Sequence, residues 1–216
     1  MRENIADQLN HHPDSHSKSE YSSRTNTGWQ KSEISLNNYQ NYLKSKSDRF
    51  ELSLIDLLYI SNFKGGNATI NEEAEKLRLK LKAYTAVLRD IDQQFTNRSL
   101  SSMATAETNI LINLVNQLVR LCSRRDTSID GFKSSYLSAL LHSFFPLLIP
   151  ILDRRLLINL NLVTRTDLLS TKQIRKIEEF YPQLIFKIRE LSIKSSKTVR
   201  QLDQEYFIIE LPAWAK

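Results

Sequence analysis

The spacing of apolar residues is typical of helices along most of the chain. Apolar positions recur every three or four residues over 71–95, 105–124, 133–143 and 171–194. No segment alternates apolar and polar positions as a half-buried strand does. Only four glycines and five prolines occur in 216 residues, a composition that favours helices over a turn-rich β fold. The pattern therefore predicts an all-α protein, with one compact multi-helix domain over residues 31–216.

The same spacing predicts which side chains face the core on the shorter helices. On a helix over 53–60, the residues expected to point inward are Leu54, Leu57 and Leu58. The long helix over 171–194 is expected to be bent or interrupted near Pro182, because a proline inside a helix removes a backbone hydrogen bond. A last helix over 197–209 precedes Trp214, which is expected to pack against the body.

Residues 1–30 have a different composition, polar and rich in Ser, His, Asn and Asp. Such a segment buries little apolar surface, which predicts a disordered tail or an extended arm. Three of the four histidines lie in it: His11, His12 and His16. Because no carboxylate or cysteine framework accompanies them, a solvated tail is favoured over a metal site. Neither a metal nor a cofactor is expected.

Charge and cysteine content narrow the function classes. The chain has 30 Lys and Arg against 24 Asp and Glu, a formal charge of +6 that fits binding to a polyanion. The single Cys122 excludes an intrachain disulfide and a multi-cysteine zinc or iron–sulfur site. The N-terminus has no apolar signal core, and the longest apolar run, 144–152, is too short to span a membrane. We therefore expect a cytoplasmic protein without a membrane partner.

The densest chemical signal lies between residues 129 and 155. Gly131 predicts a turn, Lys133 follows it, and Asp153 opens the next helix after an apolar segment with two prolines. A lysine can act as a nucleophile, and an aspartate can stabilise an oxocarbenium ion or accept a proton. Together these two groups suit cleavage of an N-glycosidic bond.

Cationic residues beside this segment are candidates for contact with substrate phosphates. They are Arg124, Arg125, Arg154 and Arg155. The glycine turn at 62–67, which contains Lys64, is a further candidate for nucleic-acid contact. Alternative interpretations remain open, because cations at 124 and 125 also suit the negative end of a helix dipole and a glycine turn can simply cap a helix.

The stretches Asp130-Gly131-Phe132-Lys133 and Pro150-Ile151-Leu152-Asp153 resemble motifs of the helix-hairpin-helix DNA glycosylases, most nearly the 8-oxoguanine glycosylase-like branch. The resemblance covers about residues 105–160. It implies that Gly131 belongs to the hairpin, Lys133 is the Schiff-base nucleophile and Asp153 is the catalytic carboxylate. The implied protein binds double-stranded DNA, flips a damaged, modified or foreign base and excises it as an N-glycosylase, with possible lyase activity. The chain departs from the family in having one hairpin glycine, two residues between Pro150 and Asp153, and no four-cysteine cluster.

Tyr136, His142 and Phe144 are the candidates for a base pocket. Each also fits a structural role, as core aromatics for the first and last and as a hydrogen-bonded buried group for the histidine. Likewise, Asp153 can serve only as a helix cap, and Lys133 can be a solvated first-turn lysine. Two other functions stay open: a non-catalytic nucleic-acid-binding protein on a helical scaffold, and a helical protein-interaction or assembly module.

Overall fold

The computed structural model describes the backbone of residues 15–66 and 68–216, and side chains from residue 27 onward. These residues form helices and turns without a β-strand, so the all-α prediction is confirmed. The α-helices are α1 (Ser15–Ser45), α2 (Leu54–Phe63), α3 (Ala74–Phe95), α4 (Thr105–Ser123), α5 (Ser134–Phe144), α6 (Arg154–Asn159), α7 (Tyr181–Ser195) and α8 (Val199–Ile208). None of the helices in these ranges has the length and apolar character needed to cross a membrane.

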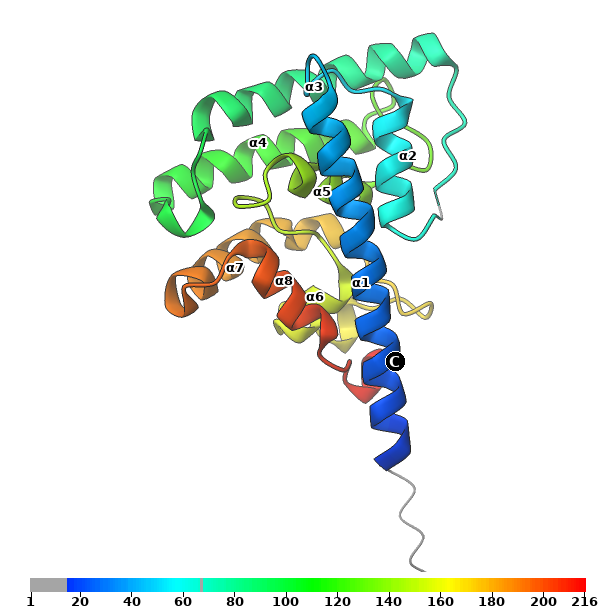
Figure 1. The fold of residues 1–216 in the computed structure, drawn as a ribbon, viewed down its shortest axis with the longest axis vertical. Coiled ribbons are helices and arrows are strands. Elements are labelled where there is room, and N and C mark those ends of the chain that lie inside the picture. Colours follow the sequence, from blue (N-terminus) through cyan, green and yellow to red (C-terminus); the bar gives the residue numbers. More distant parts are fainter. Residues whose placement is uncertain (1–14, 67) are drawn as a thin grey trace, which may run out of the picture.

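The long helix α1 connects two groups of helices (Figure 1). At one end it packs against α2, beside which α3, α4 and α5 form the upper part of the molecule in this view. Toward its N-terminal end it packs against α8, which also contacts α6 and α7. Helix α1 therefore runs along the junction of the two groups, and residues far apart in the sequence meet there.

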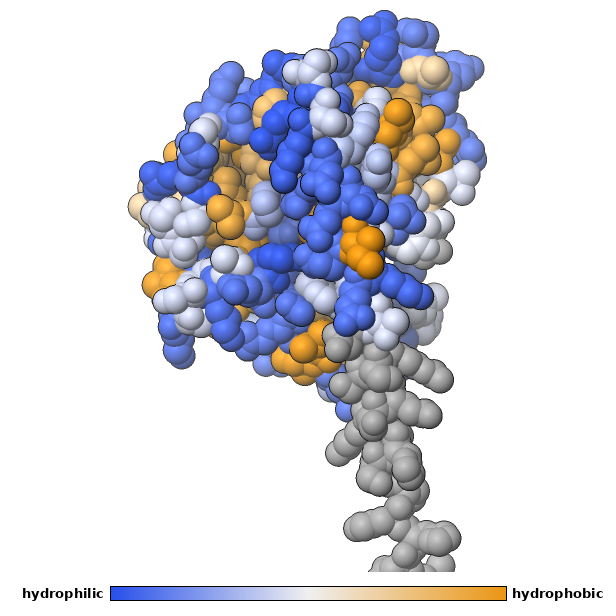
Figure 2. All heavy atoms as spheres, viewed as in Figure 1, coloured by the Kyte–Doolittle hydropathy of each residue, from blue (hydrophilic) through white to orange (hydrophobic). Residues whose placement is uncertain are grey.

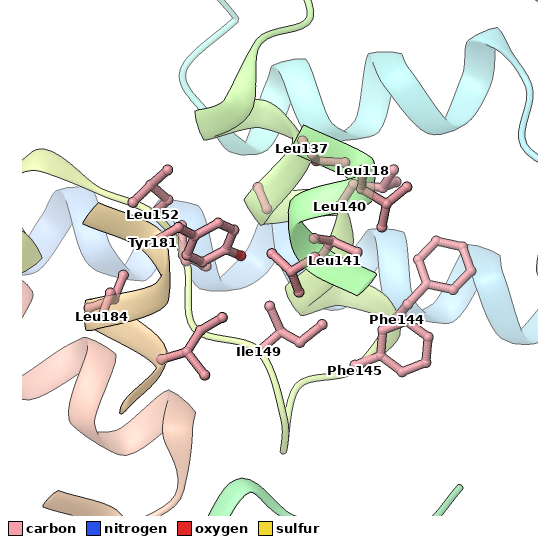
Figure 3. Close-up of a cluster of buried hydrophobic side chains, with 14 of the residues drawn as sticks. Leu118, Leu137, Leu140, Leu141, Phe144, Phe145, Ile149, Leu152, Tyr181 and Leu184 are labelled. Atoms are coloured by element: carbon pink, nitrogen blue, oxygen red, sulfur yellow. The ribbon is translucent and has the colours of Figure 1, made fainter. Parts of the chain in front are cut away.

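The centre of the core is α5 together with the segment that follows it (Figure 3). Leu137, Leu140 and Leu141 of α5 are completely buried, as are Ile149 and Leu152. The Tyr181 hydroxyl of α7 donates a hydrogen bond of 3.0 Å to the Pro150 carbonyl, which α5 and its neighbours shield from water. The apolar run that the sequence marks as chemically interesting is thus largely part of the core, apart from the exposed Leu147.

Helix α2 buries fewer leucines than the sequence predicts. Leu57 is buried, whereas Leu54 and Leu58 are 43% and 52% exposed, together with Ile55. Helices α1 and α5 pack on one side of α2 only, so the residues that point away from them stay in solvent. Figure 2 shows this apolar face as an orange patch over α2.

The region before α7 also differs from the prediction of one long bent helix. Residues 171–176 form a turn in which Lys172 and Lys176 have positive φ, and a 3-10 helix (Ile177–Phe180) leads into α7. Pro182 lies in the first turn of α7, where its missing N–H has no helical partner to lose. The proline therefore starts a helix instead of bending one.

The N-terminal segment is helical over part of the stretch predicted as a tail. Helix α1 begins at Ser15, and Trp29 is 6% exposed with its ring centroid 5.4 Å from that of Phe207. The tail prediction for residues 1–14, which includes His11 and His12, lies outside the described residues. Apolar spacing does not predict the part of α1 before residue 30, because Trp29 packs against Phe207, which comes from the far end of the chain.

Candidate functional site

A pocket of about 780 Å³ lies where α1 meets α8, the start of α6 and the turn after α2. Its wall combines aromatic side chains, Trp29 and Phe207, with charged ones, Lys64, Asp153 and Asp203. These residues come from four separate segments, and α1 supplies one complete side of the pocket. The volume lies within the range of pockets that bind small molecules or single nucleotides.

The two carboxylate oxygens of Asp153 make different contacts. Its Oδ1 accepts a 2.8 Å hydrogen bond from the backbone N–H of Arg155, so the residue caps the N-terminus of α6 as predicted. Its Oδ2 lies 3.3 Å from the Lys64 ammonium nitrogen. Both side chains are largely buried, with 15% of Lys64 and 23% of Asp153 exposed. The cap therefore orients the carboxylate and still leaves one oxygen toward the pocket.

Lys64 takes the place beside Asp153 that the sequence assigns to Lys133. Lys133 is exposed at the N-cap position of α5; it does not line the pocket and makes no ion pair with Asp153. Lys133 and Asp153 do not meet because the turn before α5, which leads into Lys133, packs against Thr69. Gly131 in that turn has a φ of +76°, and a Cβ there would come within 2.4 Å of the Thr69 carbonyl oxygen. The turn is thus a packing contact, not one wall of the pocket.

The turn after α2 holds Lys64 in place but offers few backbone donors. The Gly65 N–H donates to the Asn62 carbonyl at 3.1 Å, and the Gly66 N–H donates to the Ser61 carbonyl at 2.7 Å. Both glycines have positive φ, as is usual where a helix reverses direction. These donors satisfy the helix end, so the turn contributes its lysine side chain and not a phosphate-binding nest.

A second ion cluster lies on the α8 side of the pocket, centred on Arg200. Its Nη1 lies 2.5 Å from Asp203 Oδ2, and its Nη2 lies 2.6 Å from Glu33 Oε2 on α1. Its guanidinium carbon also lies 3.9 Å from the ring centroid of Trp29, a cation–π contact. One arginine therefore serves two carboxylates and fastens α1 to α8.

Asp203 is the most unusual acid of this cluster. It is 2% exposed, and burial raises its pKa to about 7. The negative charge of Asp153 raises the pKa further, while Arg200 and Lys64 oppose the rise. Asp203 is not among the site residues predicted from the sequence. The available signal was its position on α8, four residues after the buried Val199, which places a carboxylate on the apolar stripe.

Arg154 and Arg155 bind the C-terminal part of the chain. Arg155 donates from Nε to the Phe207 carbonyl at 2.8 Å and from Nη2 to the Ile209 carbonyl at 3.0 Å. Arg154 donates to the Ala215 carbonyl. These hydrogen bonds fasten the end of the chain to α6, which gives both arginines a structural role and leaves the predicted phosphate contacts without support.

The other predicted cations lie at the C-terminal end of α4. Arg124 forms an exposed ion pair with Asp126 at 2.8 Å, and Arg125 is exposed beside it. Neither lines the pocket. Their place at a helix C-terminus agrees with the dipole interpretation, and any nucleic-acid contact by this pair stays a prediction.

The three residues predicted for a base pocket belong to the core or its edge. Phe144 is buried, with its ring centroid 5.6 Å from that of Phe50. Tyr136 is partly buried against Phe132. His142 is completely buried, its Nδ1 lies 2.7 Å from the Ile149 carbonyl oxygen, and burial lowers its pKa to about 3. None of the three predicted residues opens into the pocket of Asp153.

Comparison with models of known protein families, with curated proteins and with solved structures gave no match. Within the part of the chain that the structure describes, no three His, Cys, Asp or Glu side chains form a group able to hold a metal ion. The groups in the pocket that can take part in chemistry are its carboxylates, its cations and its aromatic side chains.

Proposed function

We propose that the chain is a DNA-binding protein of glycosylase type, which excises a damaged, modified or foreign base, and that its reaction takes place in the pocket of Asp153. The observation that carries this proposal is the 3.3 Å contact between Lys64 Nζ and Asp153 Oδ2 inside a pocket of about 780 Å³. An oriented carboxylate beside a cation and an aromatic wall can support N-glycosidic cleavage.

The pocket suits this reaction in two respects. As the bond between the sugar C1′ and the base nitrogen breaks, positive charge develops on the sugar, and the carboxylate of Asp153 stabilises it. The α6 cap and Lys64 hold that carboxylate in one orientation, so little reorganisation accompanies the reaction. Phe207, whose ring already contacts Trp29 and the Arg155 guanidinium, contributes an aromatic edge to the pocket beside which a flipped base can lie.

The proposal changes one assignment made from the sequence. The Schiff-base role expected of Lys133 is not retained, because this residue is exposed and outside the pocket. Lys64 is the lysine beside the carboxylate, and its part is to orient Asp153 and to bind the adjacent phosphate side of the nucleotide. Water is then the group that adds to C1′.

Base release from duplexes that carry a panel of modified bases tests the proposal. Asp153→Asn keeps a good helix cap but removes the negative charge, so we expect release to slow by about 100-fold or more. Asp126→Asn changes an exposed aspartate in the same way and serves as the matched control. Absence of release by the unmodified protein from every duplex, or equal rates in Asp153→Asn and the unmodified protein, would overturn the proposal.

A second candidate is nucleic-acid binding without catalysis. It is favoured by the Lys64–Asp153 ion pair itself, since each charge already has a partner before any substrate enters. This candidate predicts salt-sensitive binding to DNA without base release, and binding by Asp153→Asn as strong as that of the unmodified protein or stronger, because a negative charge has been removed.

A further inference from the structure

The charges of the two ion clusters beside the pocket do not balance among themselves. Three carboxylates belong to its two ion clusters, those of Glu33, Asp153 and Asp203, and two cations contact them, Lys64 and Arg200. Lys31 also lines the pocket, but its side chain is exposed at the rim. Three negative charges against two positive ones leave an excess of one, which binding of a single proton removes.

Burial decides which carboxylate is the best place for that proton. The exposed fraction of the side chain is 37% for Glu33 and 23% for Asp153 but only 3% for Asp203. An uncompensated charge costs most where water is excluded, so the proton is held best on Asp203. The raised pKa of Asp203, about 7, agrees with this placement.

A second buried aspartate of the chain shows what a purely structural arrangement looks like. Asp56 is completely buried, and its carboxylate accepts hydrogen bonds from Tyr39, Lys46 and both the backbone and side chain of Ser53. Lys46 is its own cation, at 3.0 Å. Asp203, by contrast, shares its cation Arg200 with Glu33 and lies on the wall of a pocket.

We infer that Asp203 is the proton donor of the pocket, and that it protonates the base as the base leaves the sugar. The inference rests on the proposed function of the pocket. It assigns different roles to two carboxyl groups that line the pocket: Asp153, paired with Lys64, faces the charge that develops on the sugar, and Asp203 carries the proton. Two carboxyl groups in environments that favour opposite protonation states are a common arrangement for acid catalysis.

The step needs only water and the proton of Asp203. The C1′–N bond breaks, its electron pair goes to the base nitrogen, and the Asp203 O–H proton moves to that nitrogen. The carboxylate that this leaves on Asp203 is stabilised by Arg200, which already lies beside it. Water adds to C1′ and loses one proton, which restores the acid form of Asp203. The net reaction is hydrolysis of the N-glycosidic bond.

Charged and titratable groups from each neighbouring element set the pH response of Asp203. Those that act on its pKa are Arg200 on its own helix α8, Asp153 at the start of α6 and Lys64 after α2. Glu33 on α1 shares Arg200, Lys31 on α1 lines the pocket, and His142 on α5 is affected by the charge of Arg200. Since burial and Arg200 lower the pKa of His142 to about 3, this histidine stays neutral near pH 7. Asp203 is therefore the group expected to change charge in that range.

The test combines a pH–rate profile with Asp203→Asn, a neutral isostere that cannot donate a carboxylic proton. We expect base release by the unmodified protein to decline as the pH rises through about 7, the pKa of Asp203. In Asp203→Asn the rate should fall by about 100-fold or more, and the decline near pH 7 should disappear. The exposed Asp126→Asn is again the matched control.

A readout independent of activity is the titration of the Asp203 carboxyl carbon in the complete chain, followed by NMR and assigned with Asp203→Asn. A midpoint near 7 supports the inference, and a midpoint below about 5 overturns it. Base release with the same pH profile in Asp203→Asn also overturns the inference and leaves the proposed function standing. Absence of base release by the unmodified protein overturns the proposed function, and the catalytic role of Asp203 with it.

Discussion

Two regions of the molecule contain the residue types expected of a reaction site, and they use them differently. In the segment 129–152, the polar groups serve the fold: His142 Nδ1 contacts the Ile149 carbonyl while its buried Nε2 has no hydrogen-bond partner, and the turn at Gly131 packs against Thr69. In the pocket of Asp153, ion pairs join distant helices and open onto a space large enough for a ligand. In this protein, ion pairs that join distant helices at a pocket are thus a better indication of a candidate site than reactive residue types that lie close together in sequence.

The two regions also contain oppositely shifted buried groups. Burial lowers the pKa of His142 to about 3 in the first region and raises that of Asp203 to about 7 in the second. Both shifts favour the neutral form. At pH 7, however, His142 is far from its pKa of about 3, whereas Asp203 is close to its pKa of about 7.

Among the substitutions that test this comparison, Phe144→Ala is expected to change the free energy of unfolding the most. Phe144 is buried among Tyr39, Phe50 and Phe145, so its truncation should lower the free energy of unfolding by about 3–5 kcal/mol. Phe207→Ala, on the half-buried pocket wall, is the matched comparison and should cost less than half as much. Urea unfolding measures both. A small loss of stability in Phe144→Ala, with loss of base release, would restore its role as a base-contacting wedge.

The next effect in size is expected when the two glycine turns are compared. Gly131→Ala should destabilise the protein by about 2 kcal/mol or more, because the new Cβ meets Thr69 and φ is positive. Gly66→Ala has a similar positive φ but open space around the Cβ, so it should cost only about 1 kcal/mol. Thermal unfolding of both variants measures the difference. Equal losses would show that the turn at Gly131 is not fixed by packing.

The pH dependence of stability separates the two regions by sign. The pKa of His142 is lower in the folded state, so its contribution is present above about pH 6.5 and is lost as the pH falls. The pKa of Asp203 is higher in the folded state, so its contribution is present below about pH 4 and is lost as the pH rises through 7. Between pH 5 and 7 these two slopes oppose each other, each worth about 2 kcal/mol.

Asp203→Asn removes one of the two slopes. Urea unfolding of this variant at pH 5, 6 and 7 should show stability that rises with pH, by about 2 kcal/mol more than in the unmodified protein. The physical reason is that only the loss at His142 remains as the pH falls. An identical pH dependence in the two proteins would contradict the protonated state assigned to Asp203.

The smallest effect is expected at the exposed cations of α4. Arg124→Ala breaks a solvent-exposed ion pair with Asp126, which water screens, so the free energy of unfolding should stay nearly unchanged. Base release should stay unchanged, because Arg124 lies outside the pocket. A loss of DNA affinity in this variant, measured at low salt, would return the α4 terminus to the nucleic-acid-binding surface.

The helices and the cap at Asp153 could be predicted because they depend on neighbours in sequence. Apolar spacing located α3, α4 and α5 closely, and the residue type at 153 indicated the start of α6. The inward face of α2 was misassigned, because periodicity does not tell how many sides of a helix are covered.

The pocket could not be predicted, because its contacts join residues far apart in the chain. Lys64 and Asp153 are separated by 89 positions, and Glu33 and Arg200 by 167. Local spacing instead pairs Asp153 with Lys133, its nearest lysine upstream in the chain. Sequence did single out Asp153 and Lys64 separately, and a carboxylate on the buried stripe of α8, at Asp203, was a further local signal that was not used.

The proposed partner of Asp153 is the amine of Lys64 and not that of Lys133, so the most direct measurement compares the same substitution at these two lysines. Base release from the best substrate duplex is measured for Lys64→Gln and Lys133→Gln. We predict that Lys64→Gln lowers the rate by about tenfold or more, because Asp153 loses its orienting cation, and that Lys133→Gln leaves it unchanged. An unchanged rate in Lys64→Gln with a large loss in Lys133→Gln would contradict the account.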